Sequence, residues 1–296
     1  MQTELTAESR LLRILPLRFK LRSKGMGFPE FSGSAWHGGL GMMLAKQSPH
    51  AFQRLYQTAP ESRLYALLPP MQKQFAASEL FELRITLFGH GTDHALAVTQ
   101  AIAELGKTGI RPGGHYELIE ASVIEPKRET RFISAQDGFL SVPCARAVDE
   151  YLIPEPYPIE QCHIQFTTPL RIKEGNNLLR KVPDLAQFLR RIFSRLDQLA
   201  HVAEEIPPLA KTLRIALYAQ AENIEIKSSN VTPYGLERRS ARSGQQMQFS
   251  GIVGAVSYVG EMQHLIPWLR LAGIAQLGGK TAFGFGGLEI KVTNAD

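Results

Sequence analysis

The chain has 296 residues, of which 44% are hydrophobic and 21% are charged, and its formal net charge is +5 at pH 7. This composition is that of a globular protein and excludes a disordered chain, and the length gives room for two domains that each bury a core. The positive charge weakly favours an anionic partner, with nucleic acid before a membrane surface.

The first half of the chain predicts the order strand, helix, strand, strand, helix, strand. Its first strand, residues 12–22, alternates between apolar and basic side chains. The second helix is predicted to begin at a cap formed by Thr92 or Asp93 and to end at Gly106. The other elements are a helix over residues 34–47 and strands over 63–68, 80–88 and 116–124. This order is that of the ferredoxin-like fold, in which helices cover one face of an antiparallel sheet.

The same pattern returns in the second half, after a proline-containing connection (125–158) that can hold a hairpin. Its clearest element is a helix over residues 184–202 with one apolar stripe, from which Arg190, Arg191 and Arg195 are predicted to point away. The remaining elements are helical stretches over 208–221 and 262–271 and strands over 161–170, 223–227, 246–258 and 283–292. We therefore predict an α+β fold of two tandem ferredoxin-like domains, 1–124 and 159–296, with antiparallel sheets and a C-terminal glycine-rich loop.

Two cysteines, Cys144 and Cys162, are present without any C-x-x-C motif, so a zinc site built from thiolates is not expected. A single disulfide and a reduced cytoplasmic protein both fit two cysteines, and the reduced form is the simpler interpretation. The N-terminus has acidic residues where a signal peptide has basic ones, and no apolar run reaches membrane-spanning length. We expect a cytoplasmic protein without a membrane partner.

Glycines are dense near the C-terminus, in the run Leu277-Gly-Gly-Lys-Thr-Ala-Phe-Gly-Phe-Gly-Gly-Leu. Glycine leaves backbone N–H groups bare, which makes this run a candidate for holding a phosphate chain. The alternative is tight packing between a helix and a strand. An NTPase phosphate loop is not expected, because the first glycine of that motif would fall on Ile274 and because a strand follows. The candidate contacts in this run are Gly278, Gly279, Lys280, Gly284 and Gly286.

Two further groups of basic residues are candidates for contact with nucleic acid, because arginine binds phosphate in a bidentate manner. Arg238, Arg239 and Arg242 form the densest basic cluster, and the alternative is an ordinary exposed loop. Arg18, Lys20 and Arg22 form a ladder on the first strand, which is equally well explained as the solvated face of a sheet.

The chain resembles the CRISPR-associated endoribonucleases of the RAMP superfamily that trim precursor CRISPR RNA. The resemblance rests on the order and spacing of several segments: Gly33-Ser-Ala-Trp-His-Gly-Gly-Leu-Gly, Phe166-Thr-Thr-Pro-Leu-Arg-Ile, Arg239-Ser-Ala-Arg, Phe249-Ser-Gly-Ile-Val-Gly and the closing glycine-rich run. It implies two ferredoxin-like domains and RNA cleavage within a CRISPR repeat without metal or other cofactor. It also implies CRISPR repeat RNA as a partner, retention of the crRNA product, and other subunits of an effector complex as further partners.

His37 is the candidate catalytic residue. RNA is cut without metal when its own 2′-hydroxyl attacks the next phosphate, and histidine suits the proton transfers because its pKa lies near neutrality. Family members place their catalytic histidine in this region, so the resemblance supports the position. Glycines 38, 39 and 41 weaken a helix by about 1 kcal/mol each relative to alanine, so RNA or another helix is expected to come near. Lys46 is a second catalytic candidate, for stabilising the phosphorane; Ser34, Tyr56 and Tyr65 have no supporting pattern.

Two other functions fit parts of the sequence. A non-catalytic RNA-binding subunit of an effector complex would use the same scaffold, because a fold does not fix the function of its site. A nucleotide-binding enzyme that uses residues 278–281 is the more distant alternative.

Overall fold

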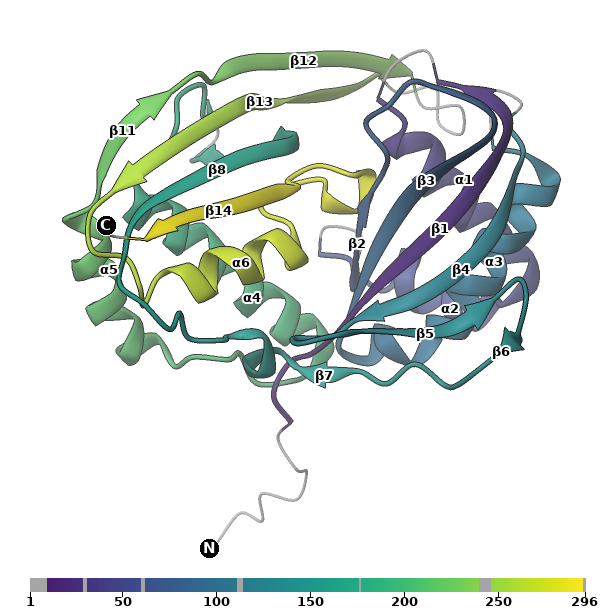
Figure 1. Cartoon of the computed structure of the whole chain (residues 1–296), viewed down its shortest axis with the longest axis horizontal. Coiled ribbons are helices and arrows are strands. Elements are labelled where there is room, and N and C mark those ends of the chain that lie inside the picture. Colours follow the sequence, from purple (N-terminus) through teal and green to yellow (C-terminus); the bar gives the residue numbers. More distant parts are fainter. Residues whose placement is uncertain are drawn as a thin grey trace, which may run out of the picture.

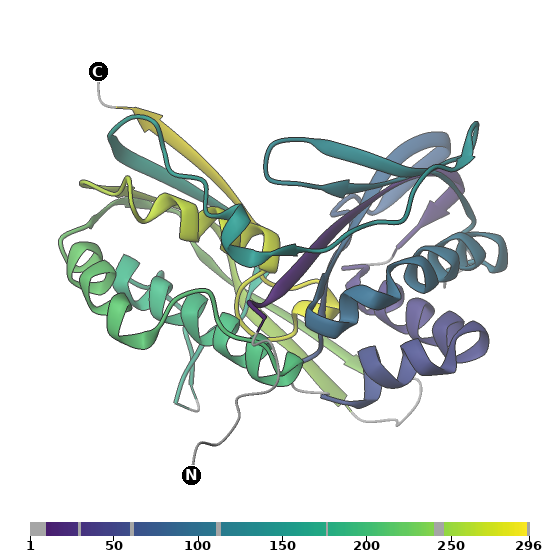
Figure 2. The same cartoon turned by 90° about the horizontal axis from the view of Figure 1, so that it is seen from below.

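The computed structural model describes residues 10–28, 31–59, 62–110, 114–175, 177–239 and 246–294, without the side chains of residues 236–239, 246–248 and 294. The chain forms two halves that lie side by side, each an antiparallel sheet with helices packed on it (Figures 1 and 2).

The sheet of the first half has the strand order β2-β3-β1-β4, which β5 and β6 extend, while β7 pairs with one end of β1. The apolar residues of β1 (Arg13–Gly27) lie in the core and its basic residues on the opposite face, as the alternation predicts. The other strands are β2 (Tyr65–Leu68), β3 (Gln74–Phe88), β4 (Tyr116–Ile124), β5 (Glu129–Ser134), β6 (Gly138–Phe139) and β7 (Arg146–Ala147). The helical elements are α1 (Gly33–Gln47), α2 (Pro49–Phe52), the π turn η1 (Gln53–Gln57), the 3₁₀ turn η2 (Gly89–His94), α3 (Ala95–Thr108) and the 3₁₀ turn η3 (Val148–Tyr151).

The second half repeats this topology, with the order β11-β13-β8-β14, and β12 pairs with the far end of β13. Its longest helix, α4 (Leu185–Ala203), buries the predicted apolar stripe and begins where the Asp184 carboxylate accepts a hydrogen bond from the Gln187 N–H at 2.7 Å. The strands are β8 (Ile159–Leu170), the β9 (Lys173–Glu174) and β10 (Asn177–Leu178) hairpin, β11 (Glu225–Ser229), β12 (Thr232–Arg239), β13 (Gln246–Val259) and β14 (Leu288–Asn294). The other helical elements are the 3₁₀ turn η4 (Lys211–Leu213), α5 (Arg214–Glu222), α6 (Ile266–Ala275) and the 3₁₀ turn η5 (Thr281–Phe283).

The tandem ferredoxin-like fold is therefore confirmed, and three details of the prediction are wrong. Helix α3 has His94 at its N-cap, because the Thr92 hydroxyl instead donates to the Gly89 carbonyl within η2. This helix also continues past Gly106 to Thr108; Gly106 is where β4 comes close, since a Cβ there would lie 2.4 Å from the Tyr116 carbonyl oxygen. The last strand begins only at Leu288, because the residues before it dock on the first half.

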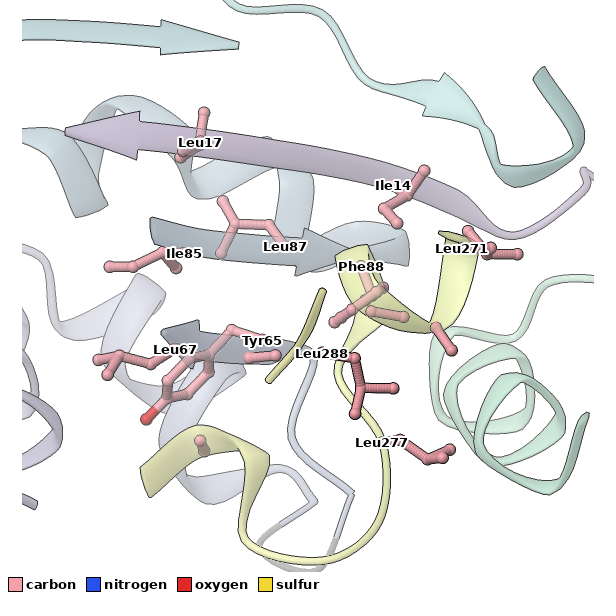
Figure 3. Close-up of a cluster of buried hydrophobic side chains, with 14 of the residues drawn as sticks. Ile14, Leu17, Tyr65, Leu67, Ile85, Leu87, Phe88, Leu271, Leu277 and Leu288 are labelled. Atoms are coloured by element: carbon pink, nitrogen blue, oxygen red, sulfur yellow. The ribbon is translucent and has the colours of Figure 1, made fainter. Parts of the chain in front are cut away.

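The two halves share one hydrophobic core. Figure 3 shows Leu271, Leu277 and Leu288 of the second half in one cluster with Tyr65 and Phe88 of the first half, and all of these side chains are buried. The N-terminal end of β1 is also tied to the second half, because the Arg13 N–H and its guanidinium both donate to the Glu205 carboxylate, at 2.8 and 2.7 Å. Extensive apolar burial between the halves holds them in a fixed arrangement.

The glycine-rich loop (residues 277–287) makes the closest approach between the halves. A Cβ on Gly33 of α1 would lie 2.0 Å from the Phe283 carbonyl oxygen, and one on Gly284 would lie 2.7 Å from the Pro69 ring. Gly287 is similarly close to Leu68 of β2, where a Cβ would lie 2.5 Å from the side chain. The loop therefore rests on α1 and β2, and glycine is needed at these contacts because no side chain fits.

We expect Gly33→Ala to lower the free energy of unfolding by about 1–3 kcal/mol, because the new methyl group must push the Phe283 backbone away from α1. Gly38→Ala is the matched control on the same helix: nothing lies within 4 Å of its Cβ position, so it should stabilise the protein by up to about 1 kcal/mol. Urea unfolding of both variants tests this contact. Equal stabilities for the two variants would contradict it.

Candidate active site

His37 lies near the start of α1, at the seam where the glycine-rich loop covers the first half. Its ring centroid is 3.9 Å from that of Phe283 in η5 and 4.9 Å from that of Tyr56. The Tyr65 hydroxyl lies 2.7 Å from His37 Nδ1, and the Tyr56 hydroxyl donates to the His37 carbonyl oxygen at 2.7 Å. Residues from α1, η1, β2 and η5 thus fix the imidazole in one orientation.

The surroundings of His37 keep it neutral. Burial lowers the pKa of His37 to about 3, and the nearby Arg63 guanidinium lowers it as well, while hydrogen bonding to the Ala282 backbone acts in the opposite direction. Burial also raises the pKa values of Tyr56 and Tyr65, so both phenols keep their protons. At neutral pH the site therefore offers an uncharged imidazole, which can accept a proton, held by two protonated tyrosines.

The sequence identified His37 but not how its neighbours are arranged. Tyr56 and Tyr65 were candidates without a supporting pattern, and neither Arg63 nor Phe283 carried a signal. The Arg63 guanidinium carbon lies 5.8 Å from the ring centroids of both Tyr56 and Phe283. These residues come from separate segments that meet only when β2 pairs beside β3 and the glycine-rich loop docks.

A basic cleft of about 630 Å³ adjoins the site. Arg63 and Phe283, which both neighbour His37, also line the cleft, so the cleft lies beside the site, although His37 itself is not among its lining residues. No described residue that lines the cleft is acidic. Its cationic side chains are those of Arg63, Arg171, Lys173, Arg191, Arg195 and Lys280. A concave surface with charge of one sign concentrates a polyanion.

Of the predicted residues in the glycine-rich loop, Gly278, Gly279 and Lys280 line this cleft, whereas Gly284 and Gly286 are not among its lining residues. Gly278 pairs with Arg171, and a Cβ on it would lie 2.3 Å from the Arg171 carbonyl oxygen; a Cβ on Gly286 would lie 1.9 Å from that of Leu277. Gly278, Gly284 and Gly286 also have φ values of 84°, 90° and 80°, which favour glycine. Packing thus accounts for these three glycines. Gly279 and Lys280 line the cleft, and Lys280 Nζ lies 4.2 Å from the Phe249 ring centroid.

The basic ladder of β1 lies on the sheet face away from the helices, where acidic side chains of neighbouring strands accompany it. Arg18 forms ion pairs with Glu82 and Glu129, and Arg22 lies 3.6 Å from Glu117. Lys20 is paired in register with Glu82 and Glu120. This face is therefore a mixed-charge surface, unlike the basic cleft.

The other predicted site residues either lie far from His37 or belong to parts of the chain that the structure does not fully describe. Lys46 is exposed in the last turn of α1, roughly 14 Å along the helix axis from His37, so the structure does not bring them together. Arg238 and Arg239 belong to β12, but their side chains are not described, and Arg242 lies outside the described residues.

Among the residues that the structure describes, no group of histidine, cysteine and carboxylate side chains is arranged to hold a metal ion. Both cysteines are free, Cys144 exposed and Cys162 buried. Within the same part of the chain, every helix is too short or too polar to cross a membrane.

Comparison with known proteins finds a family match in each half and several solved structures with a similar fold. Residues 164–288 match the family of the CRISPR-associated endoribonuclease Cas6, and residues 11–143 match a family described as an N-terminal domain. The fold is similar to that of Thermus thermophilus Cas6 in a product complex, with 18% sequence identity, a TM-score of 0.60 and coverage of 94% of this chain and 100% of that chain. A second Cas6 product complex is 15% identical, with a TM-score of 0.58 and coverage of 94% and 99%. A Cas6-RT-Cas1–Cas2 complex is 13% identical, with a TM-score of 0.63 and coverage of 97% of this chain and 48% of that chain. No curated protein sequence matches the chain.

Because the Arg63 charge holds the pKa of His37 down, Arg63→Gln should raise it from about 3 towards the ordinary value of 6.5. NMR titration of the imidazole C–H signals measures this shift. Arg54→Gln is the matched control: Arg54 lowers the pKa of His94, so this variant should raise the His94 pKa and leave that of His37 unchanged. If the pKa of His37 is the same in Arg63→Gln as in the wild type, the Arg63 guanidinium does not lower it.

Proposed function

We propose that this chain is a Cas6-type RAMP protein and a metal-independent endoribonuclease that cleaves CRISPR precursor RNA within the repeat; the family match of residues 164–288 and the fold support this proposal. The observation that carries this proposal is the neutral His37, held by Tyr65 at the seam of the two halves and flanked by Arg63 and Phe283, which line a cleft where no described residue is acidic.

The proposed reaction uses the RNA as its own nucleophile. The 2′-hydroxyl oxygen forms a bond to the adjacent phosphorus while the bond to the 5′ oxygen breaks, which leaves a 2′,3′-cyclic phosphate and a 5′-hydroxyl. His37 accepts the 2′-hydroxyl proton, and the imidazolium then returns this proton to the departing 5′ oxygen. Bound phosphate raises the pKa of His37 from its value in the free protein, which makes the imidazole a stronger base in the complex.

The basic cleft would hold the RNA backbone on either side of the cut. Its six cations neutralise phosphates without regard to sequence, so affinity should fall steeply as salt rises. The same contacts persist after cleavage, since the product keeps its phosphates, and this agrees with retention of the crRNA. Solved Cas6 proteins in product complexes, and a Cas6-RT-Cas1–Cas2 complex, support CRISPR RNA and CRISPR-associated subunits as partners.

The first test is cleavage of the cognate repeat RNA in excess EDTA. Wild-type protein should produce a cyclic-phosphate end, and His37→Ala should lower the single-turnover rate by at least about a hundredfold with little change in RNA affinity. His264→Ala, which removes an exposed histidine of the second half, is the control and should cleave normally. Tight binding without cleavage by the wild type would instead favour a non-catalytic RNA-binding subunit.

A second test concerns the hydroxyl that orients His37. Tyr65→Phe removes the 2.7 Å contact to Nδ1 and should lower the single-turnover rate by about ten- to a hundredfold, while RNA affinity stays the same. Tyr116→Phe is the matched control, because it removes a buried phenol that donates to the Ile102 carbonyl, on α3. If both variants cleave at the wild-type rate, Tyr65 does not take part.

A further inference from the structure

Arg195 of α4 is a buried cation with an incomplete set of partners. It was predicted to point away from the apolar stripe, but it is only 8% exposed and lies with its guanidinium carbon 5.7 Å from the Phe88 ring centroid of the first half. Its Nη2 donates to the Thr281 hydroxyl at 3.0 Å, whereas its buried Nε has no hydrogen-bond partner. Among the described residues no carboxylate forms an ion pair with it.

The neighbouring helix shows how this chain usually buries an arginine. Arg214 of α5 is 4% exposed, and its guanidinium donates two hydrogen bonds to the Asp197 carboxylate, at 2.6 and 2.7 Å. An unpaired buried charge costs several kcal/mol because its hydration is lost without compensation. Arg195 therefore lacks an anion of the kind that Asp197 supplies to Arg214.

The position of Arg195 indicates where that anion comes from. Arg195 lines the basic cleft beside Arg171, Arg191 and Lys280, so the space that it faces contains cations and no carboxylate from the described residues. Since no described carboxylate reaches Arg195, we look to an external anion as its partner. A phosphodiester fits, because its oxygens accept hydrogen bonds from a planar guanidinium and its charge suits a site of several cations.

Arg195 is also connected to the imidazole. Thr281, which accepts its hydrogen bond, is the first residue of η5 (Thr281–Phe283), and Phe283 packs on the His37 ring at 3.9 Å between centroids. The short turn η5 thus connects the Arg195 guanidinium, through Thr281, to Phe283, which packs on the His37 ring.

We propose that Arg195 binds an RNA phosphate in the basic cleft and, through Thr281, positions the turn that holds His37, so that occupation of the cleft aligns the histidine. This inference rests on the proposed function for its substrate. Arg195 acts here as a phosphate-binding and positioning residue, because it does not touch the reacting atoms.

The charge is tested with Arg195→Gln and a matched control, Arg190→Gln, which removes an arginine of the same helix that is exposed and paired with Glu222 outside the cleft. With a repeat RNA that carries a 2′-deoxy sugar at the cleavage position, Arg195→Gln should weaken binding about tenfold and reduce the salt slope by about one. The RNA affinity of Arg190→Gln should stay within about twofold of that of the wild type. Equal affinities for the two variants would overturn the phosphate contact. If the glutamine variant does not fold, Arg195→Lys tests the bidentate contact instead: it keeps the charge and the salt slope, and the loss of the planar guanidinium should still weaken RNA binding relative to Arg190→Gln.

The connection is tested separately with Thr281→Val, which keeps the shape of the residue and the charge of Arg195 but removes the hydroxyl. RNA affinity should be unchanged, and the cleavage rate at saturating RNA should fall about tenfold. The His37 imidazole NMR signal should shift when the 2′-deoxy RNA binds to wild-type protein, and less so in Thr281→Val. If Thr281→Val cleaves at the wild-type rate and shows the wild-type shift of the His37 signal, the positioning role is overturned.

Failure of the proposed function looks different from failure of this inference. If wild-type protein does not cleave RNA, the binding and NMR measurements still decide whether Arg195 holds a phosphate and whether Thr281 transmits its binding to His37.

Discussion

The contact between the glycine-rich loop and the first half is the constraint on which the rest of the structure depends. The Phe283 carbonyl occupies the place of a side chain at Gly33, which brings η5 onto α1 and β2. This one approach partly covers His37, places Phe283 against its ring and forms an edge of the basic cleft. Because packed interiors tolerate little added volume, the position of the histidine is set by the fit of two backbones.

Burial lowers the pKa of both His37 and Arg195, but the two residues end up in different charge states at neutral pH. It favours the uncharged form of His37, since a buried imidazole loses hydration when it is protonated. Arg195 stays charged in spite of burial, because a guanidinium does not give up its proton near neutral pH. The free protein therefore holds a neutral base next to unbalanced positive charge, and a polyanion relieves the imbalance while increasing the basicity of the imidazole.

Local patterns allowed the sequence to predict the element order, the two faces of β1 and the stripe of α4. His37 became a candidate through the proton chemistry of histidine and the family resemblance, with the neighbouring glycines as added support. Partners contributed by distant segments left no local signal: Tyr65, Arg63 and Phe283 meet His37 only through β2 pairing and loop docking. Arg195 lies off the stripe of α4, but helical periodicity gave no sign of its burial, because the first half covers a second side of the helix. A count of glycines likewise cannot tell a loop that contacts RNA from one that contacts another backbone.

The repeated topology of the two halves has a consequence for how the site assembles. The His37 imidazole belongs to one ferredoxin-like unit, and Phe283, which packs on it, belongs to the other. A single unit therefore contains neither the complete surroundings of His37 nor the complete cleft. If the units were separate molecules, the site would form only at concentrations high enough for them to associate. The peptide connection makes the assembly intramolecular, with an effective concentration on the order of millimolar for a short linker. The fraction of molecules with a formed site is therefore independent of how much protein is present.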